Sequence, residues 1–451
     1  MINLKIKDLA QLLNAEQVES DASFEGVATD SRGILPGQLF ITWEGDVFDG
    51  HQFCKQAEEK GAAAVLVEKR VDVAIPQIIV KDSIKALGTL AKHWRDQFQM
   101  PFIAVTGSNG KTTVKNMIAS IFACAYGENY LAPKKSFNNH TGVPLTLSSL
   151  NQKQKAAIIE MGMNHFGELS YLTSIVQPNV AMITNALRSH MAGVGGTVEG
   201  VAKAKAEIFE GLQENGTAVL NADDPAFDFW RNLLKDKEVL TFGLEGVADF
   251  TAHNIKVTPR GIQYDLKTPK ESIQVSSCLL GKHNIMNGLA AAAATFAMGL
   301  NAQTIAEGLS NVLPEPRRLN LKRTKAGGVL IDDSYNANPA STKKAIDVLS
   351  QFEGEKILVL GDMKELGQDE KSLHKEVGEY AKAQGIQKLW AFGDLMQEAV
   401  NGFGEGAKHF ATKDELKMFL KSHDEKGRIF LMKGSNSQKM NEEVLLLQEE
   451  E

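Results

Sequence analysis

At 451 residues the chain is too long for one hydrophobic core, and it predicts roughly three domains of ~150 residues each. Lys and Arg total 49 and Asp and Glu total 56, so the net charge of −7 excludes the basic surface that nucleic-acid binding requires. The three cysteines (Cys54, Cys124 and Cys278) lie far apart without metal-ligand spacing, which is typical of reduced cytoplasmic thiols. The amino terminus lacks the apolar centre of a signal peptide, and no apolar stretch reaches the ~20 residues that cross a bilayer. We therefore expect a cytoplasmic monomer with no nucleic-acid partner and no membrane insertion.

Three successive segments each carry an α/β pattern. Residues 1–99 mix short strands and helices and predict a small N-terminal α/β domain. Over 100–313, apolar runs such as FIAV, AAIIE and VAMITN alternate with helical stretches. This alternation predicts a doubly wound, mostly parallel sheet with ligands at the carboxyl ends of its strands. Two prolines in LPEPRR then break the pattern, and the alternation restarts over 314–451, which predicts a Rossmann-like C-terminal α/β domain.

The first segment carries one polar motif followed by aromatic residues. The string TDSR, which ends in Ser31 and Arg32, precedes PGQLFITWEG. A hydroxyl and a guanidinium could hold a diphosphate, and Phe40 or Trp43 could stack on a base. Neither feature is specific by itself.

The most specific motif is FIAVTGSNGKTT, in which a short apolar strand enters a glycine loop and then a helix. The loop comprises Gly107, Ser108, Asn109, Gly110, Lys111, Thr112 and Thr113. Its glycines let backbone N–H groups turn toward an anion, its lysine neutralises phosphate, and its first threonine can bind Mg²⁺. The usual spacing would place the first glycine at Val105, so this loop is shorter than the standard one. The motif predicts a nucleotide-phosphate site.

Polar residues follow the next two central strands. Glu160 ends one strand, and His190 lies five residues beyond Asn185, which ends the other. A carboxylate suits Mg²⁺, whereas the histidine is either a second ligand or an ordinary loop residue. On the following helix, Lys203 and Lys205 read by themselves as solvated charges.

Two later clusters remain ambiguous from their residues alone. Asn284, beside His283 and Asn287, opens an alanine-rich helix and suits either an adenine edge or a helix cap. Arg317 and Arg318 fall between domains, where a guanidinium could reach a phosphate. The string DDSYNANP, which contains Asp333, Asn336 and Asn338, could bind a ribose or a substrate, or could simply form a turn.

Taken together and in this order, these motifs resemble the Mur ligase family over nearly the whole chain. TGSNGKTT matches the short phosphate loop of the family, and TDSR…PGQLF…DGHQF resembles its UDP-binding domain. KSFNNHTGVPLTL (135–147) resembles the sugar and peptide channel, with Asn138 and Asn139 as contacts. The strings VAKAKAEIFEGL, DDSYNANP, LGDMKELG and KGS resemble the member that adds D-Ala-D-Ala.

The resemblance implies an ATP-dependent amide ligase of peptidoglycan precursor synthesis. ATP would phosphorylate the C-terminal carboxylate of a UDP-N-acetylmuramoyl-tripeptide, and the amine of D-Ala-D-Ala would attack the acyl phosphate. Residues 1–99 would bind the UDP substrate and 100–313 would bind ATP, while 314–451 would close over ATP and deliver the amine. Whether the tripeptide ends in lysine or diaminopimelate stays open.

The resemblance also implies residue roles. Thr112 and Glu160 would hold one Mg²⁺, and His190 with a carbamylated Lys205 would hold a second. The implied catalytic residues are Lys111, Glu160, His190 and Lys205. Asn284 would lie by the adenine, Asp333 by the ribose, and Arg318 between domains; here Arg317 precedes it, where the family more often has glycine. The implied substrate contacts are Ser31, Arg32, Phe40, Asn138, Asn139, Asn336 and Asn338.

Two rival hypotheses remain. A folylpolyglutamate-type ligase shares the phosphate loop, although DDSYNANP is not expected there. A nucleotide-gated switch protein would hydrolyse ATP slowly and form no amide.

Overall fold

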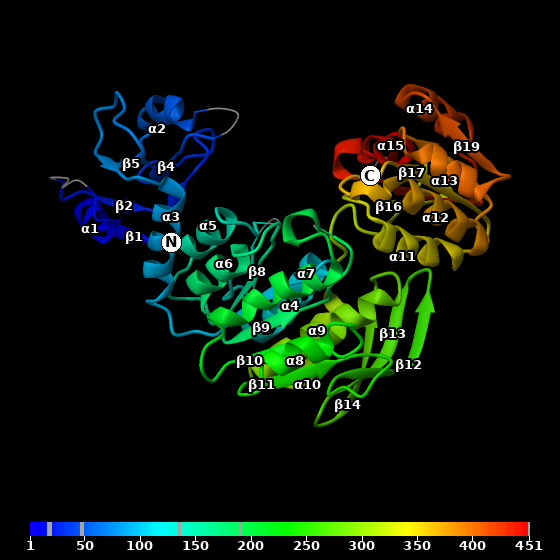
Figure 1. Ribbon diagram of the computed structural model, residues 1–451, viewed down its shortest axis with the longest axis horizontal. Coiled ribbons are helices and arrows are strands. Elements are labelled where there is room, and N and C mark those ends of the chain that lie inside the picture. Colours follow the sequence, from blue (N-terminus) through cyan, green and yellow to red (C-terminus); the bar gives the residue numbers. More distant parts are fainter. Residues whose placement is uncertain (16–19, 46–48, 134–136, 190, 450–451) are drawn as a thin grey trace.

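The computed structural model describes residues 1–15, 20–45, 49–133, 137–189 and 191–449. These residues form three α/β regions that follow one another along the chain, with the first and third on either side of the second (Figure 1). In this described part, no helix has both the length and the apolar character needed to cross a membrane.

The N-terminal region combines a two-stranded antiparallel ribbon with a small parallel sheet. The ribbon pairs β1 (Asn3–Lys5) with β2 (Ser23–Glu25). The parallel sheet runs in the order β3 (Val27–Ala28), β4 (Leu39–Ile41), β5 (Ala64–Val67) and β6 (Gln77–Ile79). Its helices are α1 (Ile6–Leu12), η1 (Gly50–Phe53), α2 (Cys54–Glu59) and α3 (Ser83–Arg95). Helices cover the sheet, so β4 and β5 are buried along their whole length.

The central region is built on a five-stranded parallel sheet in the order β11-β10-β9-β7-β8. These strands are β7 (Phe102–Thr106), β8 (Ala157–Glu160), β9 (Val180–Ile183), β10 (Thr217–Asn221) and β11 (Glu238–Phe242). The helical elements are α4 (Lys111–Tyr126), α5 (Gly142–Ser148), α6 (Glu168–Val176), η2 (Met191–Val194), α7 (Val198–Ala206), η3 (Glu207–Gly211), α8 (Phe227–Leu233), α9 (His283–Ala297) and α10 (Ala302–Asn311). Separate hydrophobic clusters fill the two faces of the sheet, which is the doubly wound arrangement predicted from the alternation.

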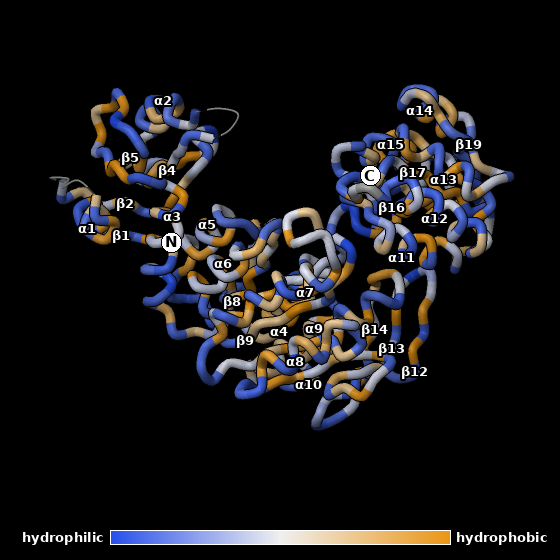
Figure 2. The backbone as a smooth tube through the Cα atoms, viewed as in Figure 1, coloured by the Kyte–Doolittle hydropathy of each residue, from blue (hydrophilic) through white to orange (hydrophobic). Residues whose placement is uncertain are grey.

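Helix α9 packs directly on this sheet because its alanine run is almost free of bulk. Residues 290–294 are all alanine and all buried. Figure 2 shows hydrophobic residues along α9 and the neighbouring α4 and α10. A further antiparallel sheet, β12 (Thr251–Thr258), β13 (Gly261–Lys267) and β14 (Ser272–Ser277), packs on α9 and α10. The alternation along the sequence did not predict this addition to the parallel sheet.

The C-terminal region has a six-stranded sheet in the order β15-β16-β20-β17-β18-β19. Only β15 (Asn320–Arg323) is antiparallel; the others are β16 (Val329–Asp333), β17 (Glu355–Gly361), β18 (Lys388–Phe392), β19 (Ala407–Phe410) and β20 (Arg428–Lys433). The helical elements are α11 (Pro339–Ser350), η4 (Gly367–Asp369), α12 (Glu370–Ala383), α13 (Met396–Phe403), α14 (Lys413–Ser422), η5 (Asn436–Gln438) and α15 (Asn441–Leu447). The expected fold class, a three-part α/β chain with a central phosphate-loop sheet, is confirmed.

Candidate active site

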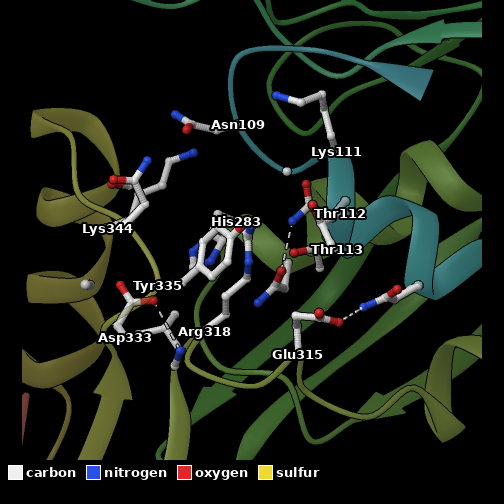
Figure 3. A pocket seen from close by; sticks show the side chains of 18 of the residues that line it. Asn109, Lys111, Thr112, Thr113, His283, Glu315, Arg318, Asp333, Tyr335 and Lys344 are labelled. Carbon is white, nitrogen blue, oxygen red and sulfur yellow. Dashed lines mark hydrogen bonds between the residues drawn. The ribbon is translucent and has the colours of Figure 1, made fainter. Parts of the chain in front are cut away.

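A cavity of about 390 Å³ lies between the phosphate loop and the C-terminal region (Figure 3). Lys111, Thr112 and Thr113 face it from one side, and Asp333 and Tyr335 face it from the other. The predicted residues that line it are Ser108, Asn109, Gly110, Lys111, Thr112, Thr113, Asn138, Glu160, Asn284, Arg318, Asp333, Asn336 and Asn338. The fold thus brings most of the predicted site into one space.

The phosphate loop is held by the end of β9. A Cβ atom on Gly107 would lie 1.8 Å from Thr184 Oγ1, so only glycine fits there. Thr184 Oγ1 donates a hydrogen bond to Asn109 O at 2.7 Å, and Asn185 Nδ2 donates to the same oxygen at 3.1 Å. Asn109 N in turn donates to Asn185 Oδ1 at 2.9 Å. The sequence pattern predicts no role for Thr184 and only a strand-end position for Asn185, because nothing in it says that β9 lies beside β7.

Lys111 lies over the loop that precedes it. Its Nζ donates to Gly107 O at 2.6 Å. Burial lowers the pKa of Lys111, while the negative charge of Glu160 opposes this shift and the positive charge of Arg318 adds to it. An ammonium in this position can neutralise phosphate oxygens bound on the loop.

Glu160 is a buried carboxylate with one oxygen unused. Its Oε1 accepts hydrogen bonds from Asn138 Nδ2 at 2.9 Å and Thr112 Oγ1 at 3.2 Å. Its Oε2 is buried and has no hydrogen-bond partner among the described residues. A buried anionic oxygen without a partner is costly, and a cation beside it removes that cost. Thr112 and Glu160 therefore fit Mg²⁺, which typically binds one or two carboxylates and takes its other ligands from phosphates and water.

The candidate cation site contains few protein ligands among the described residues. The described residues contain no cluster of three or more His, Cys, Asp or Glu side chains able to hold a metal ion alone. The predicted ligand His190 lies outside the described residues.

Burial distinguishes the two lysines of α7. Lys203 is exposed, whereas only 2% of Lys205 is exposed. Burial places the pKa of Lys205 well below its ordinary value, and the positive charge of Lys111 lowers it further. Lys205 is buried in α7 and does not line the cavity.

Asp333 has both oxygens occupied. Its Oδ2 accepts a hydrogen bond from Lys433 Nζ at 2.5 Å, and its Oδ1 accepts from Leu319 N at 3.2 Å. Burial raises the pKa of Asp333, although the positive charge of Lys433 acts in the opposite direction. Lys433 Nζ also donates to Asn336 O at 2.8 Å, so one lysine fixes this corner of the cavity. The sequence pattern predicts no role for Lys433 beyond its place in KGS.

The two linker arginines both lie near the Tyr335 ring but differ in their hydrogen bonds. The Arg317 guanidinium donates to Ser334 O at 2.6 Å and to Ser334 Oγ at 3.2 Å. The Arg318 guanidinium lies 4.4 Å from the centre of the Tyr335 ring, and its buried Nε has no hydrogen-bond partner among the described residues. Of the two, Arg318 lines the cavity. The backbone is left-handed on both sides of it, with φ of 65° at Arg317 and 52° at Leu319.

Several predicted asparagines already hold local structure. Asn338 begins α11, where its side chain accepts from Ser341 N at 2.8 Å, and its Nδ2 donates across to Asn109 Oδ1 at 3.2 Å. Asn336 Oδ1 accepts from Ala337 N. Asn139 Oδ1 accepts from Gly142 N at 2.8 Å at the start of α5, outside the cavity lining.

The predicted residues of the N-terminal region do not line the cavity. Ser31 Oγ donates to Gln56 Oε1 at 2.6 Å. Arg32 pairs with Asp30 and keeps 85% of its side chain exposed, and this pairing lowers the pKa of Asp30 to about 2. The prediction that Phe40 stacks on a base is wrong for this structure. Only 1% of Phe40 is exposed, because β4 is covered on both faces and its ring packs inside the sheet core.

Comparison with family models places the whole chain in one family. A model described as "Mur ligase family, catalytic domain" matches residues 23–95, "Mur ligase middle domain" matches 105–295, and "Mur ligase, glutamate ligase domain" matches 317–436. The chain belongs to the Mur ligase family.

Individual relatives show which members of the family this chain is similar to. The chain is 40% identical to UDP-N-acetylmuramoyl-tripeptide–D-alanyl-D-alanine ligase of Escherichia coli, over 100% of this chain and 99% of the relative. It is 35% identical to the ligase of the same name from Bacillus subtilis, over 98% of each chain. Among solved structures, MurF from Acinetobacter baumannii superposes with a TM-score of 0.92 at 32% identity, covering 99% of this chain and 98% of that one. MurF ligase from Thermotoga maritima in complex with ADP gives 0.81 at 23% identity, over 94% and 96% of the two chains, and supports the fold alone.

Proposed function

We propose that this chain joins D-Ala-D-Ala to the C-terminal carboxylate of UDP-N-acetylmuramoyl-tripeptide, with release of ADP and phosphate, in peptidoglycan precursor synthesis. One observation carries this proposal: residues of the phosphate loop line a cavity together with Glu160 and Arg318, in a chain 40% identical, over its full length, to a ligase named for these substrates. As part of this proposal, the enzyme acts in the cytoplasm as a monomer.

The reaction has two bond-forming steps. A carboxylate oxygen attacks the γ-phosphorus of ATP, which breaks the bond to ADP and leaves an acyl phosphate. The D-Ala-D-Ala amine then attacks the acyl carbon, loses a proton, and expels phosphate through a tetrahedral intermediate. No nucleophilic side chain is needed, so the task of the protein is to hold two anions together and exclude water.

The side chains around the cavity match that task. Lys111 and the loop N–H groups bind the phosphates, and Arg318 adds positive charge from the linker. Thr112 and Glu160 would hold Mg²⁺, which supplies charge neutralisation at the transferring phosphoryl group when bound. Closure of residues 314–451 over ATP would exclude water from the acyl phosphate and deliver the amine.

We also assign the remaining predicted residues to substrates as part of this proposal. Residues 1–99 would bind the UDP portion through Ser31 and Arg32. Asn138 and Asn139 would contact the sugar and peptide. The other assignments are Asn284 to adenine, Asp333 to the ribose, and Asn336 and Asn338 to the reacting groups.

Lys205 would carry a carbamate derived from CO₂ and, with His190, hold a second Mg²⁺. Only a neutral amine reacts with CO₂, and the lowered pKa of Lys205 favours that form. Nitrogen bonds to the carbon of CO₂ and loses one proton, which gives an anionic oxygen donor close to the positive charge of Lys111.

A pair of substitutions tests the carbamate. Lys205→Ala is expected to lose at least ~100-fold in kcat and to recover part of it with formate or acetate, because a free carboxylate can replace the missing donor. Lys203→Ala is the matched control, since this lysine is exposed two residues away, and it should keep near-full activity. Full activity of Lys205→Ala without added carboxylate would remove Lys205 from the site.

Phosphate release tests the function itself. Release should require both UDP-N-acetylmuramoyl-tripeptide and D-Ala-D-Ala, and mass spectrometry should find the amide product. ATP hydrolysis that ignores the amine would indicate a switch protein. Activity with glutamate and a pterin substrate would indicate a folylpolyglutamate-type ligase.

A further inference from the structure

Three aliphatic side chains, Leu279, Val312 and Leu313, are among the residues that line the cavity, and Leu313 keeps 77% of its surface exposed. Val312 and Leu313 closely precede Glu315 in the chain, and Cys278, the neighbour of Leu279, donates through Sγ to Val312 O at 3.4 Å, so these apolar residues and Glu315 lie near one another. Figure 3 shows Lys111 of the phosphate loop at the top of the cavity and Glu315 at the bottom. A nucleotide with its phosphates on the loop therefore places its flat, apolar base at the end formed by these aliphatic side chains.

Two polar side chains stand together at this apolar end. Asn116 lies one helical turn beyond Thr112 on α4, and Glu315 lies in the linker after α10. Asn116 Nδ2 donates a hydrogen bond to Glu315 Oε2, which is the dashed line from Glu315 in Figure 3. This bond holds the carboxylate over the cavity that both side chains line.

Glu315 keeps one acceptor oxygen available. Within the described ranges, Glu315 Oε1 accepts no hydrogen bond, and no Lys, Arg or His nitrogen lies within 4.0 Å of the carboxylate. Asn284, another polar side chain that lines the cavity, has more of its hydrogen-bonding groups in use. Its Nδ2 donates to Leu280 O at 2.8 Å, and its Oδ1 accepts from Asn287 Nδ2 at 2.8 Å. The group best placed to accept a new hydrogen bond at the base is therefore a carboxylate.

We propose that Glu315, oriented by Asn116, accepts a hydrogen bond from the 6-amino group of adenine and so selects ATP over nucleotides with a 6-oxo purine. The inference rests on the proposed ATP-dependent function and adds a specificity-determining residue to it. A 6-amino group is a donor that a carboxylate pairs with, whereas a 6-oxo group is an acceptor that it repels. The Asn116–Glu315 pair is partly buried, and a site that hydrogen-bonds its ligand discriminates against the analogue that cannot form the bond, because the polar group of the site is then left unpaired.

The test compares ATP with ITP, which carries oxygen in place of the 6-amino group. kcat/KM is measured with both nucleotides for the wild type, Glu315→Gln and Glu307→Gln. Glu307 is the matched control because it is exposed on α10, its carboxylate accepts from Gln303 on the same helix and from no other described residue, and it does not line the cavity. Calorimetric binding of ADP and IDP to the same proteins gives the same ratio without requiring ligase turnover.

We expect the wild type to prefer ATP by about 10- to 100-fold. Glu315→Gln should reduce this ratio at least ~10-fold, because the glutamine amide can turn a donor toward the 6-oxo group, while Glu307→Gln keeps the ratio. An equal loss with ATP and ITP would overturn the proposal and leave Glu315 as a contact between linker and α4. If Glu315→Gln does not fold, Asn116→Ala is used in its place. An unchanged ratio of kcat/KM for ATP over ITP in Asn116→Ala would also overturn the proposal. A wild type that binds ADP over IDP but forms no amide would contradict the proposed function and not this inference.

Discussion

Two buried carboxylates face the cavity from the ends of two parallel strands, and their surroundings are opposite. Glu160 ends β8 and has an oxygen with no partner among the described residues, whereas Asp333 ends β16 with both oxygens bonded. The difference lies in the neighbouring strand. Glu160 is in register with Val105 of β7, and Asp333 is in register with Lys433 of β20. The same position at a strand end thus gives a free anionic ligand in one sheet and a neutralised ion pair in the other.

The cavity thus has two sides with different roles, one formed by the central sheet and the other by the C-terminal sheet. The central sheet supplies the charges that act on phosphate: Lys111 bonds to a backbone oxygen of the loop and not to a carboxylate, and Glu160 Oε2 has no partner among the described residues. The C-terminal sheet supplies a fixed wall, because Lys433 ties Asp333 to Asn336. Substitutions on the first side should affect chemistry, and those on the second should affect stability.

The largest effect is expected for Lys111→Ala. Loss of this charge should lower kcat/KM for ATP by roughly 10³-fold or more, because electrostatic stabilisation of the transferred phosphoryl group is the main catalytic term. Binding of the UDP substrate, measured by calorimetry, should remain largely intact. Equal loss of turnover and of UDP-substrate binding would contradict the conclusion that Lys111 acts on the phosphates of ATP and not on the UDP substrate.

Glu160→Gln should follow with a loss of about 10²- to 10³-fold in kcat. The neutral amide is a weaker cation ligand, so the concentration of Mg²⁺ needed for half-maximal rate should rise. Initial rates measured across a magnesium titration check this. An unchanged magnesium dependence would mean that the unpaired Oε2 is not a cation ligand.

Asp333→Asn should act mainly on folding. Lys433 would keep its buried charge without an anionic partner, which should lower the free energy of unfolding by about 3 kcal/mol. Urea unfolding measures this, and the magnesium dependence should stay at the wild-type value. The double variant Asp333→Asn/Lys433→Met should regain part of the stability, since the buried charge is gone. A single variant as stable as the wild type would show that the ion pair does not hold this wall.

Arg32→Ala should have the smallest effect. Its pair with Asp30 is exposed, so the free energy of unfolding should hardly change. KM for the UDP substrate should rise about 3- to 10-fold, with KM for ATP unchanged. Lys7→Ala, which removes another exposed ion pair in the same region, is the control and should leave both KM values alone. A rise in KM for ATP instead would place Arg32 outside the UDP site.

The sequence predicted those parts of the fold and site that depend on local pattern. The alternation of apolar runs predicted the α/β regions, and the strand-loop-helix motif predicted the phosphate loop with Lys111 and Thr112. Pairing between distant strands could not be predicted in this way. Lys433 lies 100 residues beyond Asp333, and only the strand order places β20 beside β16.

Burial was the other limit of prediction from the sequence. The run LFI of β4 does not reveal that both faces of the strand are covered. The sequence therefore predicts a base contact at Phe40, although the Phe40 ring is in the core. The residues alone did not distinguish Lys203 from Lys205, and the resemblance implied Lys205; the structure adds that Lys205 is buried and Lys203 exposed. The bracing of Asn109 by Asn185 depends on β9 lying next to β7.

Asn338 has a thermodynamic consequence that follows from its two bonds. One side-chain atom caps α11, and the other bonds the Asn109 side chain of the phosphate loop. A helix cap contributes about 1 kcal/mol, so the loop and the first turn of α11 share one small energetic element. A ligand that binds with Asn109 turned away from Asn338 loses this bond between the two regions, and by thermodynamic linkage the strength of the bond then enters the affinity for that ligand.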